Sequence, residues 1–390
     1  MKATAPKALL AFQKQFSELR DPRINRTKKH SLESVLAIAF SSILMGANGW
    51  DALEDFGRHH ESFFATFLDL PHGTPSADTF RRFFCAVDLT AFELLFRAWA
   101  RSLGRELSGT VVATDGKAVR GAVVKGRLKF PLHLMHVWSV EHQLVLAQKR
   151  VNGASGEPAA LLEMLQQLDL EGATVTADAG NCTKPVTEHI RGAKAHYALA
   201  LKGNRGPIFA AAKACFALEE ALNFTGCSVM LSDEEGHGRL ETRVTYALTV
   251  TPEMKLPLVS KKSTHSWHDV KSLVMIERSR TVKKKTTIER HYFLSSHEAD
   301  ASKLAKVIRS HWSVENGLHW MLDVGFDEDR RHIRDQKGAE CFALMNRMAL
   351  AMLKRADLGK RHTSIASKRK LLDWQPDLVP SVIAAGFQAI

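Results

Sequence analysis

The sequence lacks long apolar runs and paired cysteines. Its most apolar stretch, "VLAIAFSSILM" at residues 35–45, has 11 residues, whereas a helix that crosses a bilayer needs about 20. We therefore expect a buried helix there and no membrane partner. The first residues also lack the apolar core of a signal peptide. The five cysteines are widely spaced and form no CxxC pair, which favours reduced thiols in the cytoplasm over a disulfide framework or a zinc site.

Acidic residues are also scarce relative to basic ones. The chain of 390 residues has 42 Asp and Glu against 54 Lys and Arg, which gives a formal net charge of +12 and a sequence pI near 9.5. Such a field favours a polyanionic partner, most simply nucleic acid, although a basic protein without such a partner has the same composition. The hydrophobic content of 45% is enough for a sizeable core and for two or three units of about 150 residues each.

In the first half of the chain, the residue pattern changes at about residue 105 from one typical of helices to one that alternates strands and helices. Residues 1–105 are expected to be all-helical, and their basic stretch "PRINRTKKH" suits either a DNA-binding module or a plain helical packing unit. Residues 106–206 have the pattern of three strands, helix, strand, helix and strand, with a turn expected at Asp115 and Gly116. This order is typical of an α/β layer with a mixed sheet.

The second half interrupts this alternation and then returns to helix. Residues 207–298 predict a helix followed by a β-rich insertion, and residues 299–356 predict helices that carry Glu315. Residues 357–390 are expected to form a basic tail. The run at 354–370 has seven Lys and Arg against one Asp, a net charge of +6, and is either an arm that lies on DNA or a solvated surface run.

One carboxylate falls where helical spacing predicts burial. The stretch "IRSHWSVENGLHWMLDV" at residues 308–324 repeats its apolar positions every three or four residues. Glu315 stands in line with Leu304, Ile308, Leu318 and Leu322, so it should face inward. A buried carboxylate is costly unless something pairs with it. That partner is either a nearby Arg or Lys, or a metal ion shared with other carboxylates.

Two aspartates end apolar strands expected in the α/β layer. Asp115 follows "VVAT" and Asp178 follows "TVTA", each just before a turn that contains glycine. Strand ends are where sites form in open α/β sheets. Together with Glu315 they are three like charges that repel one another unless a divalent cation neutralises them. Oxygen ligands suit Mg²⁺ or Mn²⁺. A pair of such ions commonly stabilises the attacking and leaving oxygens when a phosphodiester is attacked in line. The plainer alternative makes each aspartate an ordinary turn residue.

Five segments, taken in their order along the chain, resemble one known family: "TDGKAVRGA", "DAGNCTKPVTEHI", "LKGNRGPIF", "GHGRLETR" and "HWSVENGLHWMLDVGFDED". They are similar to bacterial insertion-sequence transposases related to the H-repeat-associated proteins of Rhs elements, over nearly the whole chain. That family consists of DDE transposases. The resemblance implies an RNase H-like mixed-sheet core with a β-rich insertion, preceded by an all-helical segment. It also implies that Asp115, Asp178 and Glu315 are the catalytic residues and the metal ligands.

The surroundings of the glutamate depart from the pattern of related transposases. These often have Arg four residues before the glutamate, Tyr seven before it and Lys seven after it, where this chain has His311, Ile308 and Leu322. Contact with the DNA end is therefore expected from other residues of the same stretch, namely His311, Asn316 and His319. The alternative is that these three are helix-packing residues.

Further DNA contacts are expected from the insertion. The segment "DEEGHGRLETR" places His237, Arg239 and Arg243 around a turn flanked by glycine, where a guanidinium could hold a DNA phosphate. Arg239, Glu241 and Arg243 share one strand face, so the plainer alternative is a cross-strand ion pair. If the insertion is only structural, the phosphate contacts are expected at Lys117, Arg120 or Lys202.

These observations predict a DDE transposase that cuts at the ends of an insertion sequence and joins the freed 3′-hydroxyl to target DNA with two Mg²⁺ or Mn²⁺ ions. The alternatives are a catalytically silent DNA-binding protein and a metal-dependent nuclease. The expected partners are the terminal inverted repeats, the target DNA and a second copy of the chain when paired ends are bound. The expected location is the cytoplasm, at the nucleoid.

Overall fold

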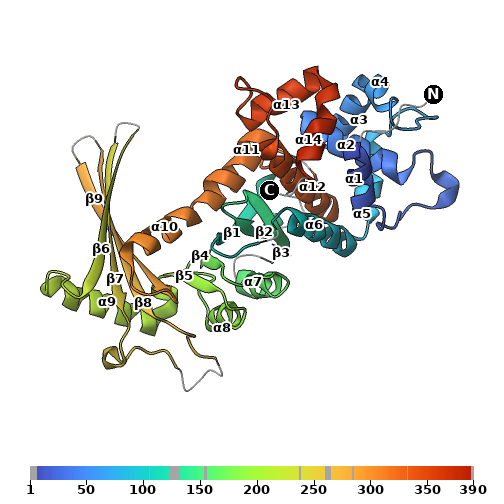
Figure 1. Ribbon diagram of the computed structural model, residues 1–390. Helices are drawn as coiled ribbons and strands as arrows, with labels where there is room; N and C mark the ends of the chain where they lie inside the picture. The colour runs from blue at the N-terminus through green and yellow to red at the C-terminus, as the bar shows by residue number, and fades with distance from the viewer. Residues whose placement is uncertain are drawn as a thin grey trace.

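The computed structural model describes residues 7–104, 106–122, 132–152, 156–236, 239–259, 265–282, 285–331 and 333–387. Within them, nine strands form one sheet in the order β3-β2-β1-β4-β5-β9-β8-β7-β6, which Figure 1 shows running from the core into a long ribbon. The core strands are β1 (Val111–Val119), β2 (Leu132–Ser139), β3 (Leu144–Val151), β4 (Thr174–Ala177) and β5 (His196–Leu201).

The first five strands have the predicted RNase H-like arrangement. Strands β1, β4 and β5 are parallel, and β2 and β3 extend the sheet antiparallel beside β1. The β-branched and apolar residues of these strands are buried almost without interruption, as expected where helices cover both faces. The helices between the strands are α7 (Glu157–Leu165) and α8 (Lys184–Gly192), as the sequence predicts.

The turn predicted at Asp115 and Gly116 is wrong. Strand β1 continues through both residues to Val119, and Asp115 pairs with His136 of β2. Glycine is needed here for a different reason, because a Cβ on Gly116 would lie 2.3 Å from Glu157 Oε1 and 2.6 Å from His133 Nε2. The glycine therefore indicates a close approach of side chains to the strand, where a turn was expected.

The predicted β-rich insertion extends the same sheet. Strand β9 pairs antiparallel with β5, and the three remaining strands follow it outward as antiparallel neighbours. Helix α9 lies on one face of this extension, where Phe209 and Phe216 contact Tyr292. Helix α10 crosses the other face (Figure 1). The bounds are α9 Gly206–Ala221, β6 Cys227–Gly236, β7 Arg239–Thr249, β8 Ser272–Val282, β9 Lys285–Ser295 and α10 Ala301–His311.

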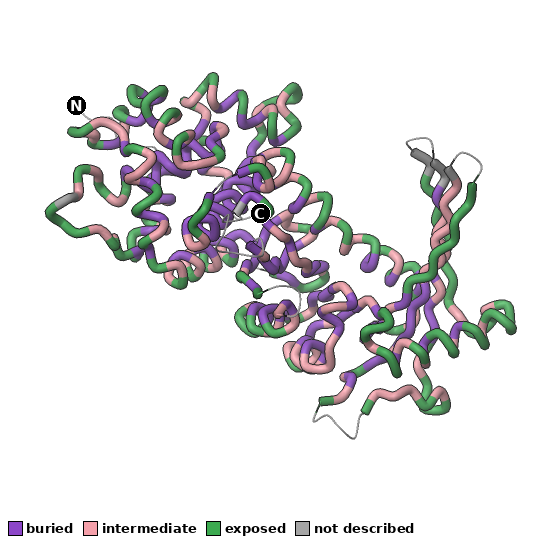
Figure 2. Tube along the Cα trace, turned by 180° about the vertical axis from the view of Figure 1, so that it is seen from behind, coloured by how far each residue is buried: buried purple, intermediate pink, exposed green. Residues whose placement is uncertain are grey.

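Helices from both ends of the chain form one helical body. The last helices pack against the first ones, α14 on α1, α13 on α2, and α12 on α2, α5 and α6, and Figure 2 shows their shared buried interior. The Trp99 indole donates a hydrogen bond of 2.8 Å to the Gly386 carbonyl. The bounds are α1 Lys7–Gln15, α2 Leu32–Met45, α3 Trp50–His59, α4 Glu61–Phe64, α5 Ala77–Ala86, α6 Leu89–Leu103, α11 Trp320–Phe326, α12 Gln336–Arg355, α13 Ile365–Trp374 and α14 Val379–Ala385.

The basic run at 354–370 is solvated only in part, because Lys360, Arg361 and Lys370 are exposed while its other four basic residues are buried or half-buried. Lys368 is buried and donates to two backbone carbonyls at the end of α12, and Lys354 donates to the Gly317 carbonyl. Arg369 is buried against α2, where it donates to Ile43 and Ala47. These cations cap the ends of helices and are not available to a distant ligand.

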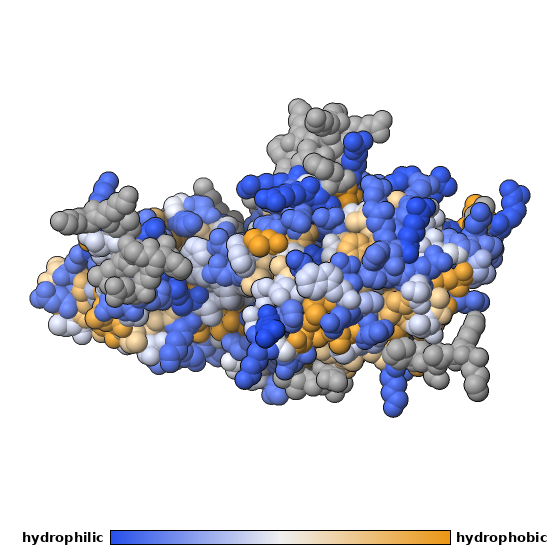
Figure 3. Space-filling view, turned by 90° about the horizontal axis from the view of Figure 1, so that it is seen from above, coloured by the Kyte–Doolittle hydropathy of each residue, from blue (hydrophilic) through white to orange (hydrophobic). Residues whose placement is uncertain are grey.

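One face of the molecule is mostly polar. Figure 3 shows hydrophilic residues over most of the face that it draws, with apolar residues in patches between them. Among the described residues, no single helix is long and apolar enough to cross a membrane. Helices α2 and α3 reach the required length and composition only as a pair, which is bent by 93°.

Candidate active site

The two aspartates lie next to each other where strands β1 and β4 separate. The parallel register of these strands ends at the pair Thr114 and Ala177; Asp115 is the next residue on β1, and Asp178 directly follows the end of β4. Asp115 Oδ1 accepts a hydrogen bond of 2.9 Å from the Gly116 amide. Asp178 Oδ1 accepts two from Asn181, at 3.1 Å from its backbone amide and 2.7 Å from its side chain. The structure therefore brings together the two predicted aspartates.

Glu315 begins a short π-helical turn, Glu315–His319, between α10 and α11. The predicted burial of Glu315 is wrong, since it is exposed while Val314 and Leu318 take the buried positions. The helix is interrupted at Trp312, before the π-helical turn, and Val314 takes the buried position that the spacing predicts for the glutamate. Segments of π-helix inside longer helices occur frequently at functional sites.

The charge of Asp115 is poorly compensated. Burial and, to a smaller extent, the nearby carboxylates of Asp178, Glu157 and Glu315 together raise its pKa to about 7, against the opposing effect of the Gly116 amide. Electrostatically, Asp115 therefore lies within reach of both other predicted site residues. A carboxyl group with raised pKa among like charges is a common mark of a functional site.

Sequence reasoning missed Glu157, a fourth carboxylate of this cluster. It is the first residue of α7, is buried, and lies beneath Gly116. Its Oε1 is 2.6 Å from His133 Nε2, and its Oε2 accepts a 3.1 Å bond from Asn181 Nδ2. Asn181 thus links Glu157 to Asp178. An acidic residue in the first turn of a helix is common for helix-dipole reasons, so the sequence contained no signal that set Glu157 apart.

The donor chemistry of the cluster fits a divalent cation. Its members are carboxylates, the ligands that Mg²⁺ and Mn²⁺ prefer, and a cation would relieve the repulsion that raises the pKa of Asp115. No three His, Cys, Asp or Glu side chains in the described parts of the chain are arranged as a closed ligand set. Holding one ion between the aspartates and Glu315 therefore requires side-chain movement.

The three polar residues predicted beside the glutamate have different surroundings. His311 Nδ1 is 3.1 Å from Thr176 Oγ1 on β4, and burial lowers its pKa. Asn316 is exposed. His319 is buried, with Nε2 3.3 Å from His136 Nδ1 and Nδ1 3.6 Å from Asp115 Oδ2. The burial of His319 runs against its predicted contact with DNA.

The basic residues predicted to hold phosphate also differ from one another in burial and in ion pairing. Lys117 is buried and pairs with Asp323 at 2.6 Å and Asp329 at 3.5 Å, which runs against a role in DNA contact. Arg120 and Lys202 are exposed. Arg243 pairs with Glu234 at 3.0 Å and also with Glu241, as the plainer alternative expects. His237 and the side chain of Arg239 lie outside the described residues.

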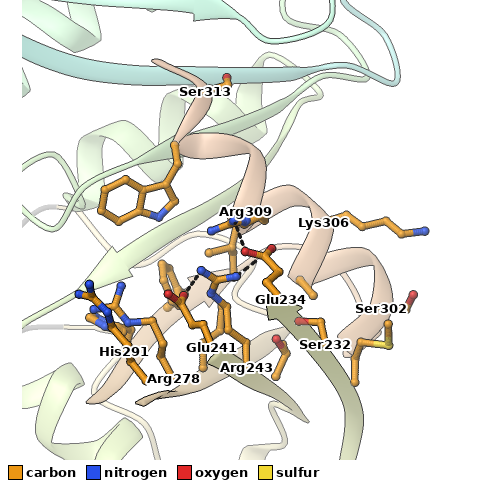
Figure 4. A pocket seen from close by; sticks show the side chains of 18 of the residues that line it. Ser232, Glu234, Glu241, Arg243, Arg278, His291, Ser302, Lys306, Arg309 and Ser313 are labelled. Carbon is orange, nitrogen blue, oxygen red and sulfur yellow. Dashed lines mark hydrogen bonds and ion pairs between the residues drawn. The ribbon is translucent and has the colours of Figure 1, made fainter. Parts of the chain in front are cut away.

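A cavity of about 910 Å³ lies between α10 and the strands of the insertion. Figure 4 shows Arg243 of β7 and Arg309 of α10 both directed at Glu234, with which each forms an ion pair. The lining has five Lys and Arg against two Glu, and continues to Trp312, Ser313 and Asn316 beside Glu315. A positively charged groove that ends at a carboxylate cluster suits a phosphodiester chain. Its basic residues are Arg243, Arg278, Arg280, Lys306 and Arg309.

The core is RNase H-like, with two aspartates at the point where its parallel strands β1 and β4 separate. The chain belongs to the DDE transposase family, because residues 106–352 match the family "Transposase DDE domain" and residues 13–100 match "DDE_Tnp_1-associated".

The relatives agree with this assignment. The putative transposase YncI of Escherichia coli O157:H7 is 32% identical over 95% of this chain and 93% of its own length. The H repeat-associated putative transposase YhhI of Escherichia coli K12 is 32% identical over 88% of this chain and 90% of its own. A piggyBac transposase solved in a synaptic complex with hairpin DNA aligns at 11% identity with a TM-score of 0.40, over 98% of this chain and 75% of its own.

Proposed function

We propose that this transposase is catalytically active, cutting DNA at the ends of an insertion sequence and joining the freed 3′-hydroxyl to target DNA. One observation carries the proposal. Asp115 and Asp178 are adjacent at the divergence of β1 and β4, and the pKa of Asp115 is raised by burial and by the charges of Asp178, Glu157 and Glu315. A folded protein keeps such repulsion where function requires it.

Asp115, Asp178 and Glu315 would hold two Mg²⁺ or Mn²⁺ ions. When bound, such ions lower the pKa of an attacking hydroxyl or water and stabilise the leaving oxygen. The protein's own residues place the carboxylates: the β1–β4 register aligns the aspartates, Asn181 holds Asp178, and the π-helical turn presents Glu315 to the open side.

DNA would approach along the basic cavity between α10 and the insertion. Its lining leads from Arg278 and Arg280 to Asn316, next to Glu315. We propose the terminal inverted repeats and the target as the DNA substrates, a homodimer on paired ends as the working assembly, and the nucleoid in the cytoplasm as its location. We also propose the predicted division into units at 1–105, 106–206, 207–298, 299–356 and 357–390, with the last packed on the first.

The test uses the full chain and a short DNA that carries one end of the element. Asp115→Asn, Asp178→Asn and Glu315→Gln should each reduce cleavage below detection while DNA affinity changes less than about threefold, because each removes a metal ligand and no phosphate contact. Asp55→Asn and Glu18→Gln, on exposed helix and turn positions, are the controls and should cut at the parental rate.

The same assay separates the alternatives. Cleavage without joining would indicate a nuclease, and binding without cleavage in Mg²⁺ or Mn²⁺ would indicate a catalytically silent DNA-binding protein. Strand transfer at the parental rate by one of the three site variants would remove that residue from the site.

A further inference from the structure

A line of buried polar groups runs from the helical body to Asp115. It starts at Arg347 on α12, which is fully buried. The Nη1 and Nη2 atoms of Arg347 both donate to the Glu328 carboxylate, at 3.0 Å between Nη2 and Oε2. Arg347 Nε and Nη2 also lie 3.3 and 3.2 Å from His136 Nε2. His136 is itself fully buried on β2, opposite Asp115.

The guanidinium decides where the proton of His136 lies. Arginine has only donors, so His136 Nε2 must accept from Arg347. Burial and the Arg347 charge both keep the pKa of His136 well below its usual value, so the ring is neutral and has its proton on Nδ1. Gln148 Oε1 also lies 3.2 Å from Nε2. A rotated Gln148 amide donates to the same acceptor, whereas Arg347 has no such alternative.

The proton on His136 in turn decides the tautomer of His319. His136 Nδ1 lies 3.3 Å from His319 Nε2. Since Nδ1 of His136 has the proton, Nε2 of His319 accepts, and a neutral His319 has its own proton on Nδ1. That nitrogen is the one that faces Asp115 Oδ2, at 3.6 Å. Catalytic hydrogen bonds are often this long in the absence of substrate and tighten when it binds.

We propose that His319 is a positioning residue for Asp115, and that the ion pair of Arg347 and Glu328 fixes its N–H toward the carboxylate through His136. This rests on the proposed catalytic role of Asp115. His319 ends the π-helical turn that Glu315 begins, so it ties the segment carrying the glutamate to the strand carrying the aspartate. The opposite tautomer would turn a lone pair toward the ionised Asp115 carboxylate and push the two elements apart.

The first test measures the tautomers without metal or DNA. In the full chain labelled with ¹⁵N-histidine, long-range ¹⁵N–¹H correlation distinguishes Nδ1–H from Nε2–H rings. His319→Gln and His136→Gln assign the two resonances by their loss. We expect both rings to be neutral with the proton on Nδ1. A proton on Nε2 of either ring, or a charged ring at pH 7, would overturn the proposal.

The second test asks whether this N–H sets metal affinity. Asparagine places an amide N–H near the position of Nδ1, whereas glutamine places it near Nε2. His319→Asn should therefore bind Mn²⁺ within about threefold of the parental protein in calorimetry, while His319→Gln and His319→Ala should bind about 10-fold more weakly or worse, the usual loss when a residue that orients a metal ligand is removed. His59→Gln, at an exposed position, is the control. Near-ultraviolet circular dichroism checks the fold.

The outcomes distinguish this inference from the proposed function. If the parental protein binds Mn²⁺ and cuts DNA while His319→Ala does both equally well, the positioning role is wrong and the proposed function stands. Equal losses in the asparagine and glutamine variants would also reject the role, because a packing defect does not depend on which ring nitrogen is replaced. If the parental protein binds no Mn²⁺ and Asp115→Asn changes nothing, both proposals fail.

Discussion

At the scale of single residues, the site is defined by charge that the protein leaves uncompensated. Lys117, the cation nearest in sequence to Asp115, pairs with Asp323 and Asp329. His319, which does face Asp115, is neutral because burial lowers its pKa to about 3. Asp115 therefore faces a backbone amide, the neutral ring of His319 and several carboxylates, an arrangement that destabilises its anion until a cation arrives.

This imbalance predicts how the metal-free protein responds to pH. The pKa of Asp115 is raised from 3.8 to about 7 on folding, so the folded state keeps a proton that the unfolded state releases. The stability due to the neutral carboxyl is present below pH 4 and is lost as the pH rises to about 7. The raised pKa amounts to a few kcal/mol at about 1.4 kcal/mol per pH unit, and solvent contact at 34% of the side chain reduces our expectation to roughly 1–2 kcal/mol.

Asp115→Asn should accordingly be more stable than the parental protein at pH 8 and indistinguishable from it near pH 4. Urea unfolding in chelator at both pH values measures the difference, with Asp55→Asn as the control. Adding Mn²⁺ at pH 8 should stabilise the parental protein and not the variant. A pH-independent difference would mean that the substitution acts through packing and not through charge.

The sequence identifies the residues that carry charge but not those that hold them in place. Asp115, Asp178 and Glu315 stand out because they interrupt apolar patterns or match family segments. Glu157, Asn181, His136 and Arg347 do not, because each is ordinary in its local context and acquires its role from contacts with residues distant in sequence.

At the scale of secondary-structure elements, local pattern predicted most strands and helices of the core. Strands β2 to β5 and helices α7 and α8 follow from β-branched runs, turn residues and Pro158 in the first helical turn, all of which act over a few residues. The two errors near the site, the length of β1 and the exposure of Glu315, arise where tertiary contacts override that pattern. Strand β1 is extended by its pairing with β2, and the interruption of the helix at Trp312 puts Val314 in the buried position that the pattern gives to Glu315.

The cavity beside the insertion leads to a prediction about DNA affinity. Arg278 and Arg280 lie on the face of β8 that lines the cavity, and Arg280 Nε is buried without a hydrogen-bond partner among the described residues. Replacing both by alanine should weaken duplex binding and reduce the log–log salt slope by roughly 1–2, at about 0.9 for each phosphate that is no longer neutralised. Fluorescence anisotropy across a salt series measures both quantities.

Arg290 provides the matched control for that experiment. It lies on β9 with its side chain on the α9 side, paired with Glu220 and Glu277 at 2.6 and 2.7 Å. Arg290→Ala removes a basic residue from the same sheet but not from the cavity, so the salt slope should stay unchanged. If both variants reduce the slope equally, general charge and not the cavity governs binding.

At the scale of the whole molecule, the helices from the two ends of the chain pack against each other. Helices α12 to α14 complete the helical body begun by α1 to α6, and the hydrogen bond from Trp99 to Gly386 joins residues 287 positions apart. No local pattern predicts this closure, because the basic run at 354–370 has the composition of a solvated segment. The burial of Lys368 and Arg369 depends on carbonyls at the ends of α12 and α2, which only the folded chain brings to them.

Arg369 joins helix α13 to the end of α2, and its removal should destabilise the fold. Its guanidinium donates to the Ile43 carbonyl at 2.8 Å, to Ala47 at 3.1 Å and to Gly325, and burial lowers its pKa to about 9. Arg369→Ala would leave these buried carbonyls without donors, at about 1–3 kcal/mol for each group that finds no water, against which the removal of a buried charge recovers part. We expect a net loss of roughly 2–4 kcal/mol in the free energy of unfolding, measured in urea. Lys360→Ala, in the same basic run but exposed, should change it by less than about 0.5 kcal/mol. Equal effects of the two substitutions would show that Arg369 is as dispensable to the fold as a solvated lysine, and that the helical body is held by its apolar contacts alone.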